Sequence, residues 1–293
     1  MIVLSDEVRE ATAIVALETT LVAHGFPPGE GVAVGIESER RVRQAGAVPA
    51  TIGVLDGKVR VGLSHDELER FDGSARKAGA RDLAVCAAQG AVGATTVGAT
   101  LSVCRVAGLR FMATGGLGGV HRGFPQPPDV SADLGELART QALVVSAGIK
   151  SLLDVPSTVE LLETVGVPVL GFRTDELPLF YSAHGGPKLP ARVESAEEAA
   201  RVASAHWELG GAGLLVAQPP PDSLDDVEPL IQEALAEAER EHVSGQAVTP
   251  FVLSRLHERS GGRTLSANRE LVYANATLAG LIAVAAEAVA ARA

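Results

Sequence analysis

Short apolar runs rich in β-branched residues alternate with helical patterns along nearly the whole chain, and this alternation limits the fold more than any other feature. Strands that alternate with helices favour a layered α/β/α fold, in which helices cover a mostly parallel sheet. A turn of Asp56 and Gly57 between two such runs is typical of a β-hairpin, which makes the predicted sheet mixed. The runs expected to form strands are Ala13–Leu17, Ala50–Leu55, Arg110–Thr114, Ala142–Ala147, Val167–Phe172 and Gly213–Ala217.

Helix starts are indicated by serine residues that are followed three positions later by glutamate, which is the pattern of a capping box. The three instances are Ser64 with Glu67, Ser157 with Glu160 and Ser195 with Glu198. Thr249 directly precedes Pro250 and predicts a further N-cap, and the chain from Ser266 onward predicts one long Ala-rich helix. No repeat, charge block or long linker divides the sequence, so we predict a single domain over residues 1–293.

The composition is that of a folded protein, because 46% of the 293 residues are hydrophobic and 21% are charged. A formal net charge of −11 makes nucleic acid an unfavourable partner. Cys86 and Cys104 are too few for a disulfide framework or a zinc cluster. The first residues lack the basic start of a signal peptide, and the longest apolar run, Ala276–Ala286, is too short to span a bilayer. We therefore expect a cytoplasmic protein with neither a membrane nor a nucleic acid as its partner.

A glycine-rich segment follows the predicted strand Arg110–Thr114. Four of the five residues 115–119 are glycine, which allows positive φ angles and brings successive N–H groups close to an anion. Thr114 adds a hydroxyl group, and His121 and Arg122 add further hydrogen-bonding heads. The segment is expected to hold a phosphate group, or else to be a tight turn beside a core histidine. It has neither the Gly-Lys-Ser/Thr ending of an ATP-binding loop nor a dinucleotide GxGxxG pattern, so neither ATP nor NAD is indicated.

Lys150 is one of only four lysines among 25 basic residues, and it follows the apolar run Ala142–Ile149. Its side chain should lie at the carboxyl end of a buried strand, where burial favours the neutral, nucleophilic amine. Such an amine attacks carbonyl carbons and forms a Schiff base. The alternative is a lysine that caps an exposed strand end or pairs with Asp154.

Glu18 follows another apolar run, Ala13–Leu17. Burial of a carboxyl group at a strand end raises its pKa toward the range of a general acid. The alternative is a core glutamate that neighbours such as Thr19, Thr20 or His24 satisfy by hydrogen bonding.

Asp129 and Asp133, with Ser131 between them, lie in a proline-rich loop that leads to a helix. Carboxylate and hydroxyl oxygens are the ligands that Mg²⁺ and Mn²⁺ prefer. The alternative is that the two aspartates are ordinary acidic residues near a helix N-terminus, where the helix dipole favours them. The sequence has no HExxH motif and no convincing Ser-His-Asp set.

These segments together resemble one known family over almost the whole chain. Its most distinctive word is TGGLGGVHRG at residues 114–123. The other matching segments, in the family's order, are residues 16–20, 24–25, 44–51, 93–96, 129–133, 147–151, 166–168, 249–251 and 267–268. On these motifs the chain resembles the pseudouridine-5′-phosphate glycosidase family, also called the indigoidine synthase A-like family.

The resemblance implies reversible cleavage of pseudouridine 5′-phosphate to uracil and ribose 5-phosphate, by a homotrimer that binds one Mn²⁺ per subunit. Lys150 matches the lysine that forms a covalent adduct at C1′ of the opened ribose, Glu18 matches the proton donor, and Asp129 matches the Mn²⁺ ligand. Gln218 stands where the family usually has asparagine before proline, which leaves contacts to the base there open. The positions that match residues of the substrate site are Lys77, Val97, Thr114, His121, Ser131, Asp133 and Asn268.

Other functions fit the same residues less fully. A Schiff-base lyase for a different sugar phosphate would use Lys150 and the glycine-rich segment, but it would not need to accept uracil. A non-catalytic sensor of sugar phosphates or nucleotides would use the same segment, but it has no need for a nucleophile beside a buried acid. A ribokinase-like phosphotransferase would share the fold class, but no ATP-binding motif supports it.

Overall fold

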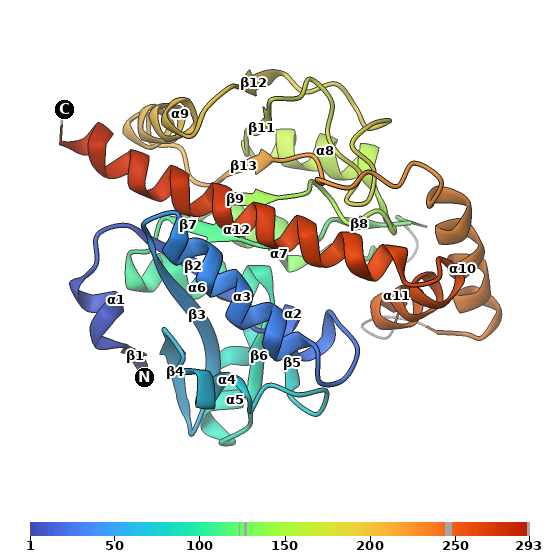
Figure 1. The fold of residues 1–293 in the computed structure, drawn as a ribbon, viewed down its shortest axis with the longest axis horizontal. Helices are drawn as coiled ribbons and strands as arrows, with labels where there is room; N and C mark the ends of the chain where they lie inside the picture. The colour runs from blue at the N-terminus through green and yellow to red at the C-terminus, as the bar shows by residue number, and fades with distance from the viewer. Residues whose placement is uncertain (123, 126–127, 244–247, 292–293) are drawn as a thin grey trace.

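The computed structural model describes residues 1–122, 124–125, 128–243 and 248–291, and it consists of a central sheet between layers of helices (Figure 1). This arrangement confirms the predicted α/β/α fold with a mixed, mostly parallel sheet. The strands are β1 (Ile2–Leu4), β2 (Ile14–Glu18), β3 (Val48–Leu55), β4 (Lys58–Val61), β5 (Arg76–Ala78), β6 (Gly93–Thr95), β7 (Phe111–Ala113), β8 (Val120–His121), β9 (Leu143–Ser146), β10 (Leu153–Asp154), β11 (Val169–Phe172), β12 (Ala191–Val193) and β13 (Leu214–Ala217). The helices are α1 (Asp6–Glu10), α2 (Thr20–His24), α3 (Gly31–Gln44), α4 (His65–Leu68), the 3₁₀ turn η1 (Ala80–Asp82), α5 (Leu83–Ala88), α6 (Val97–Ala107), α7 (Ala132–Leu137), α8 (Val155–Thr164), α9 (Ala196–Glu208), α10 (Glu228–Arg240), α11 (Val248–Arg259) and α12 (Arg263–Ala290).

The main sheet of the described chain has 11 strands, in the order β1-β4-β3-β2-β7-β9-β13-β11-β12, with β6 attached to β3 and β5 to β6. From β3 to β12 along this path every pair is parallel. The expected hairpin is confirmed, because β3 pairs antiparallel with β4 and both Asp56 and Gly57 have positive φ angles. The six predicted strands are all present. One sheet thus joins strands from residue 2 to residue 217, while the division into a single domain stays a prediction.

The register of the central strands brings their carboxyl ends to one place. Leu17 of β2 is paired with Ala113 of β7, and Ala113 is paired with Val145 of β9. The segments that follow these three strands therefore start side by side at the same edge of the sheet. Ligands bind at this edge in open parallel sheets.

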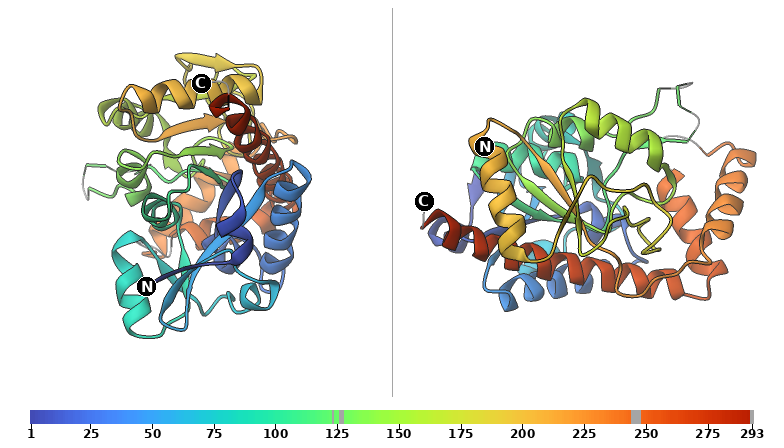
Figure 2. Two further views of the ribbon diagram at one scale, coloured as in Figure 1. Left: turned by 90° about the vertical axis from the view of Figure 1, so that its left-hand side faces the viewer. Right: turned by 90° about the horizontal axis from the view of Figure 1, so that it is seen from above.

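Each face of the sheet builds its own core, because successive side chains of a strand point to opposite faces. Leu17 and Val145 belong to the core that α3, α9 and α12 cover. Ala16 and Val144 belong to the core that α6, α7 and α8 cover. The views of Figure 2 show α3 and α12 together on one side of the sheet.

The long helix α12 explains the apolar C-terminal sequence. By length and composition alone it is the one helix of the described residues that could cross a membrane, but 44% of its most apolar 18-residue window is buried inside the protein. The helix instead packs across β2, β7 and β9 and against α3 and α9. Gly280 is required at the crossing with α3, since a side chain there would meet Ala45 and the backbone of Val42.

Two of the four predicted N-caps are confirmed. Ser64 and Glu67 form the full capping box of α4. Ser195 caps α9 by accepting from the N–H of Glu198, although the Glu198 carboxylate accepts from Glu194 rather than from Ser195.

Of the other two predicted caps, the one at Ser157 was wrong and the one at Thr249 stays a prediction. Helix α8 begins at Val155, because the Asp154 carboxylate accepts the N–H of Ser157 at 3.0 Å and makes Asp154 the N-cap. For Thr249, helix α11 is described from Val248 onward, and the contacts of the Thr249 side chain lie outside the described part of the chain. In α8, Asp154 lies three residues before Ser157 and can form the N-cap hydrogen bond one turn earlier. Pro156, which follows soon after, suits the first turn of a helix.

The two candidate caps of α8 can be separated by mutation. Asp154→Ala should lower the free energy of unfolding by about 1 kcal/mol, because the N–H of Ser157 loses its acceptor. Ser157→Ala should change it by less than about 0.5 kcal/mol. Urea unfolding of both variants measures this difference. A larger loss for Ser157→Ala would place the helix start at Ser157.

Candidate active site

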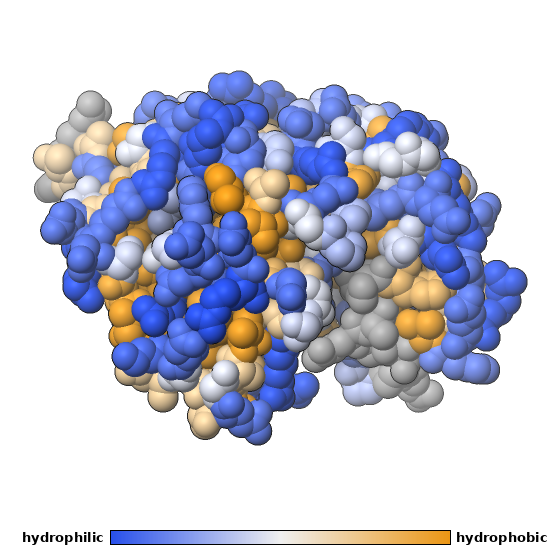
Figure 3. All heavy atoms as spheres, turned by 60° about the horizontal axis from the view of Figure 1, so that its bottom comes forward, coloured by the Kyte–Doolittle hydropathy of each residue, from blue (hydrophilic) through white to orange (hydrophobic). Residues whose placement is uncertain are grey.

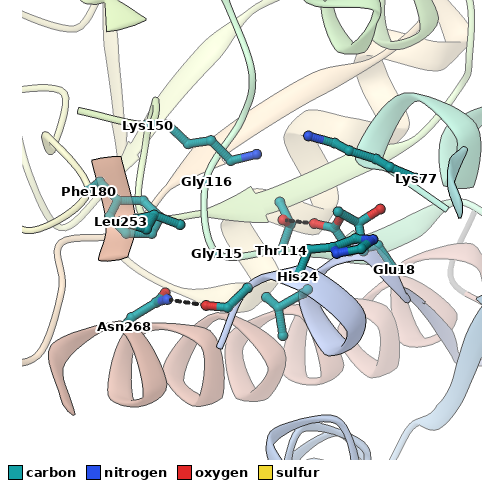
Figure 4. A pocket seen from close by; sticks show the side chains of 13 residues that line it. Glu18, His24, Lys77, Thr114, Gly115, Gly116, Lys150, Phe180, Leu253 and Asn268 are labelled. Carbon is teal, nitrogen blue, oxygen red and sulfur yellow. Dashed lines mark hydrogen bonds between the residues drawn. The ribbon is translucent and has the colours of Figure 1, made fainter. Parts of the chain in front are cut away.

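A cavity of about 350 Å³ opens at the carboxyl ends of β2, β7 and β9 (Figure 4). Five residues predicted for the site line this cavity: Glu18, Lys77, Thr114, Lys150 and Asn268. Glu18 ends β2, and Thr114 and Lys150 follow β7 and β9. These three strands are parallel neighbours, which is why residues far apart in sequence meet here. Lys77 comes from β5 at the side branch of the sheet, and Asn268 comes from α12. The structure thus places these five together, while their chemical roles stay predictions.

Glu18 is the last residue of β2 and is only 8% exposed. The hydroxyl group of Thr114 donates a hydrogen bond to its Oε1 at 2.5 Å. Burial raises the pKa of Glu18, and this effect outweighs the opposing influence of the Lys150 cation and of the Thr114 hydrogen bond. A carboxyl group in this setting keeps its proton to higher pH than an exposed glutamate, as a general acid must.

The polar residues next to Glu18 in sequence form their hydrogen bonds with other segments. Thr19, Thr20 and His24 all hydrogen-bond to backbone carbonyl oxygens of other segments. Thr114, 96 residues away in sequence, takes their place. Glu18 therefore has a hydrogen-bond partner, Thr114, that is distant in sequence. The Glu18 side chain also lines the cavity.

Lys150 and Lys77 extend into the cavity from opposite sides, with their ammonium groups turned toward one another (Figure 4). Burial lowers the pKa of Lys77, and the Lys150 cation lowers it further, against the raising influence of Glu18 and Asp133. The alternative pairing of Lys150 with Asp154 is wrong for the described residues, because the Asp154 carboxylate caps α8 and forms no ion pair with Lys150.

The backbone holds Lys150 by two segments. Its N–H donates to Leu117 O at 3.1 Å, and the preceding Ile149 forms a parallel bridge with Leu117. The glycine-rich segment and the segment that carries Lys150 are thereby paired directly. A shift of either would move the amine relative to Thr114 and Glu18.

The glycines of residues 115–119 are required by close neighbouring side chains and not by positive φ angles. The prediction of positive φ angles was wrong, since none of these four glycines has one. Each instead makes room for a neighbouring side chain. A side chain at Gly116 would meet the Phe180 ring, one at Gly118 would meet Ser131 and Asp133, and one at Gly119 would meet Thr158.

Two backbone groups of this segment remain open to a ligand. Gly115 and Gly116 line the cavity, and within the described chain the N–H of neither residue donates to another residue. Successive free N–H groups are suited to an anion such as a phosphate group. The expected anion site is thus compatible with the structure without unusual glycine conformations.

Asp133, Ser131 and Val97 do not line the cavity. The Asp133 carboxylate accepts the N–H of Gly98 at 2.8 Å and the N–H of Gly118 at 3.0 Å. Ser131 is the N-cap of α7 and accepts the N–H of Asp133. The reading of Asp133 as an ordinary helix N-terminal residue is incomplete, because its carboxylate joins two other segments.

His121 and Asp129 form a pair outside the cavity lining. The Nδ1 atom of His121 lies 3.7 Å from the Asp129 carboxylate, and the His121 N–H donates to Asp129 O at 2.9 Å. The described residues contain no cluster of three potential metal ligands. The Asp129 carboxylate is 47% exposed, so the donor set fits a hydrated divalent ion held by one carboxylate rather than a closed protein cage.

Sequence reasoning missed the apolar part of the wall, which comes from Leu21, Phe180 and Leu253. Phe180 has φ of +63°, a conformation that aromatic residues rarely adopt, and its N–H donates to Ala147 O at 3.0 Å. Nothing in its sequence context signals this position. Gln218 does not line the cavity, and its Oε1 is buried with no partner among the described residues.

Whether position 118 requires glycine can be tested by mutation. Gly118→Ala should lower the free energy of unfolding by about 1–3 kcal/mol, because its methyl group would overlap Ser131 and the Asp133 carboxylate. Gly135→Ala in α7 is the matched control, since its methyl group has space and alanine is the better helix former. Urea unfolding of both variants provides the measurement. Equal stability of Gly118→Ala and the parent would contradict this packing.

Comparisons with known proteins place the chain in a family. The family model described as "Indigoidine synthase A like protein" matches residues 4–285. Proteins named pseudouridine-5′-phosphate glycosidase from Nocardioides sp. and Streptomyces griseus are 47% and 48% identical, covering 95% and 97% of this chain and 93% and 91% of their own.

Two solved structures are also similar. The indigoidine synthase A-like protein of Thermotoga maritima has a TM-score of 0.87 and 39% identity over 97% of this chain and 96% of its own. The prealnumycin C-glycosynthase AlnA, in complex with ribulose 5-phosphate, has a TM-score of 0.90 and 39% identity over 100% of this chain and 99% of its own. The chain therefore belongs to the indigoidine synthase A-like family.

Proposed function

We propose that this chain is a pseudouridine-5′-phosphate glycosidase, which reversibly cleaves its substrate to uracil and ribose 5-phosphate. The observation that carries the proposal is the placement of the Lys150 amine and the buried carboxyl group of Glu18 in one cavity. Relatives of nearly equal length that bear this enzyme's name support the choice of substrate. A sugar phosphate is also the ligand named for the similar C-glycosynthase.

The bond to be broken joins two carbon atoms, so protonation of a leaving nitrogen cannot release the base. Glu18 protonates the ring oxygen O4′ while the Lys150 nitrogen, reacting in its free-base form, bonds to C1′, which breaks the C1′–O4′ bond and opens the ribose. The proton that the lysine nitrogen loses returns to Glu18. The cavity allows this exchange because both side chains line it.

The lysine nitrogen then supplies the electrons for C–C cleavage. Its lone pair forms a C1′=N bond, the electron pair of the C1′–C5 bond stays with C5 of the base, and Glu18 protonates C5 to give uracil. Water adds to the iminium carbon and releases ribose 5-phosphate and the free lysine. The sum is one water consumed for each pseudouridine 5′-phosphate cleaved.

The phosphate group is assigned to the open N–H groups of Gly115 and Gly116, with Lys77 as a nearby cation. Binding of the phosphate group orients C1′ against Lys150, so part of the binding energy lowers the activation barrier. Thr114 holds the Glu18 carboxyl group in place. Asn268 completes the wall from α12, and Val97, Ser131 and Asp133 support the substrate site from behind.

We also propose one Mn²⁺ per subunit, held by Asp129 with His121 beside it. A bound ion would supply positive charge for a phosphate or a water molecule in this region. A homotrimer, from the resemblance to the family, and a cytoplasmic location, from the composition of the sequence, complete the proposal.

The substrate and the metal can be tested in one experiment. Purified protein incubated with pseudouridine 5′-phosphate should release equal amounts of uracil and ribose 5-phosphate, followed by absorbance and chromatography. Chelation should abolish the release and Mn²⁺ should restore it. Release that persists after chelation would contradict the metal assignment. No release with any divalent ion would favour a lyase for another sugar phosphate.

The two catalytic roles need separate variants. Borohydride with ribose 5-phosphate should leave a reduced adduct on Lys150, and Lys150→Ala should abolish both adduct and turnover. Glu18→Gln should lower kcat about 10²–10⁴-fold, since an amide cannot donate the proton. Activity of the parent should fall as pH rises through the raised pKa of Glu18. An adduct on another residue, or a loss below tenfold for Glu18→Gln, would contradict these roles.

A further inference from the structure

His24 is a titratable side chain of the cavity wall that the proposed reaction does not use. It is the last residue of α2, and it lines the cavity together with Glu18 and Lys77. Figure 4 shows the imidazole ring of His24 among the side chains of the cavity wall, which also include Glu18 and Thr114. The position is close to the reacting groups, so its hydrogen-bonding state bears on the ligand.

One hydrogen bond settles which ring nitrogen of His24 carries the hydrogen. Nε2 lies 2.9 Å from the carbonyl oxygen of Ala75. A carbonyl oxygen only accepts, so Nε2 donates and the neutral ring keeps a bare lone pair on Nδ1. Ala75 is buried and directly precedes β5, which carries Lys77, so the ring is anchored to a fixed element.

The Nδ1 atom is left for a ligand. Throughout the part of the chain that the structure describes, no protein group donates to Nδ1. The ligand that matches a bare acceptor is an N–H donor. In the proposed substrate the sugar is bonded to C5 of the base, so both ring nitrogens keep their hydrogens, whereas an N-linked pyrimidine nucleotide has lost one.

The direction of the substrate in the cavity agrees with this match. The open N–H groups of Gly115 and Gly116 suit the phosphate end. Protonation of C5 by Glu18 requires the base to lie against Glu18, and His24 lines the same cavity as Glu18. The base is therefore expected on the His24 side of the cavity.

We propose that His24 is a specificity-determining residue whose Nδ1 accepts a hydrogen bond from a ring N–H of the pyrimidine. The inference rests on the proposed function, since it names the contact that recognises the base. A base with no hydrogen at that position leaves the acceptor unpaired, which is how hydrogen-bonding sites reject close analogues.

The test uses the synthetic direction, where uracil and ribose 5-phosphate are supplied separately. His24→Gln should raise the KM for uracil by about tenfold or more, because its amide replaces Nε2 and leaves no acceptor at Nδ1. His24→Asn, whose amide oxygen can replace Nδ1, should show a smaller rise, and His24→Leu should match His24→Gln. The rate of the borohydride-trapped adduct from ribose 5-phosphate alone should stay within twofold of the parent in all three. His184→Gln, at an exposed histidine, is the matched control.

The outcomes distinguish a failure of the proposed function from a failure of the role assigned to His24. If the parent forms no adduct and no product, the proposed function fails. If the parent is active but His24→Gln keeps its KM for uracil, only the role of His24 is overturned. Equal losses in adduct formation and uracil use would also overturn it, because they would show that His24 merely positions Lys77 or Glu18.

Discussion

The carboxylate of Asp133 holds two segments in the positions that the cavity requires. It accepts one N–H from Gly98 at the start of α6 and one from Gly118 in the glycine-rich segment. A buried charge is tolerated only when it is hydrogen-bonded, and here two backbone donors meet that condition. Thr114, Gly115 and Gly116 lie between this anchor and β7. The open N–H groups and the Thr114 hydroxyl therefore take their places from a side chain that itself lies outside the cavity.

Much of the fold could be predicted because the strands are buried on both faces. Such strands appear as continuous apolar runs, and turn residues such as Asp56 and Gly57 mark their ends. The start of α8 was missed because both Asp154 and Ser157 suit an N-cap and the serine–glutamate spacing favours Ser157, whereas Asp154 makes the cap hydrogen bond. The glycine-rich segment shows a related limit. A sequence records that side chains are missing, but it does not say whether the reason is a backbone angle or a close neighbour.

The candidate site was predictable where its residues follow parallel strands. Glu18, Thr114 and Lys150 come together because the carboxyl ends of β2, β7 and β9 share one edge of the sheet. Lys77 reaches the cavity through the side branch of β5 and β6, and only the family resemblance pointed to it. Phe180 could not be found at all, because an apolar residue in an apolar context carries no mark of its unusual backbone.

Helix α12 has a consequence for how the chain acquires its structure. It is the most C-terminal helix of the described residues, yet it covers β2, β7 and β9, and the Asn275 amide donates to the backbone oxygen of Thr114 at 2.8 Å. A ribosome must therefore release most of this helix before the cavity has its full wall. Until then the part of this apolar face that α12 covers stays exposed, which makes the growing chain prone to aggregation. The order of synthesis thus makes the functional region among the last parts of the protein to become native.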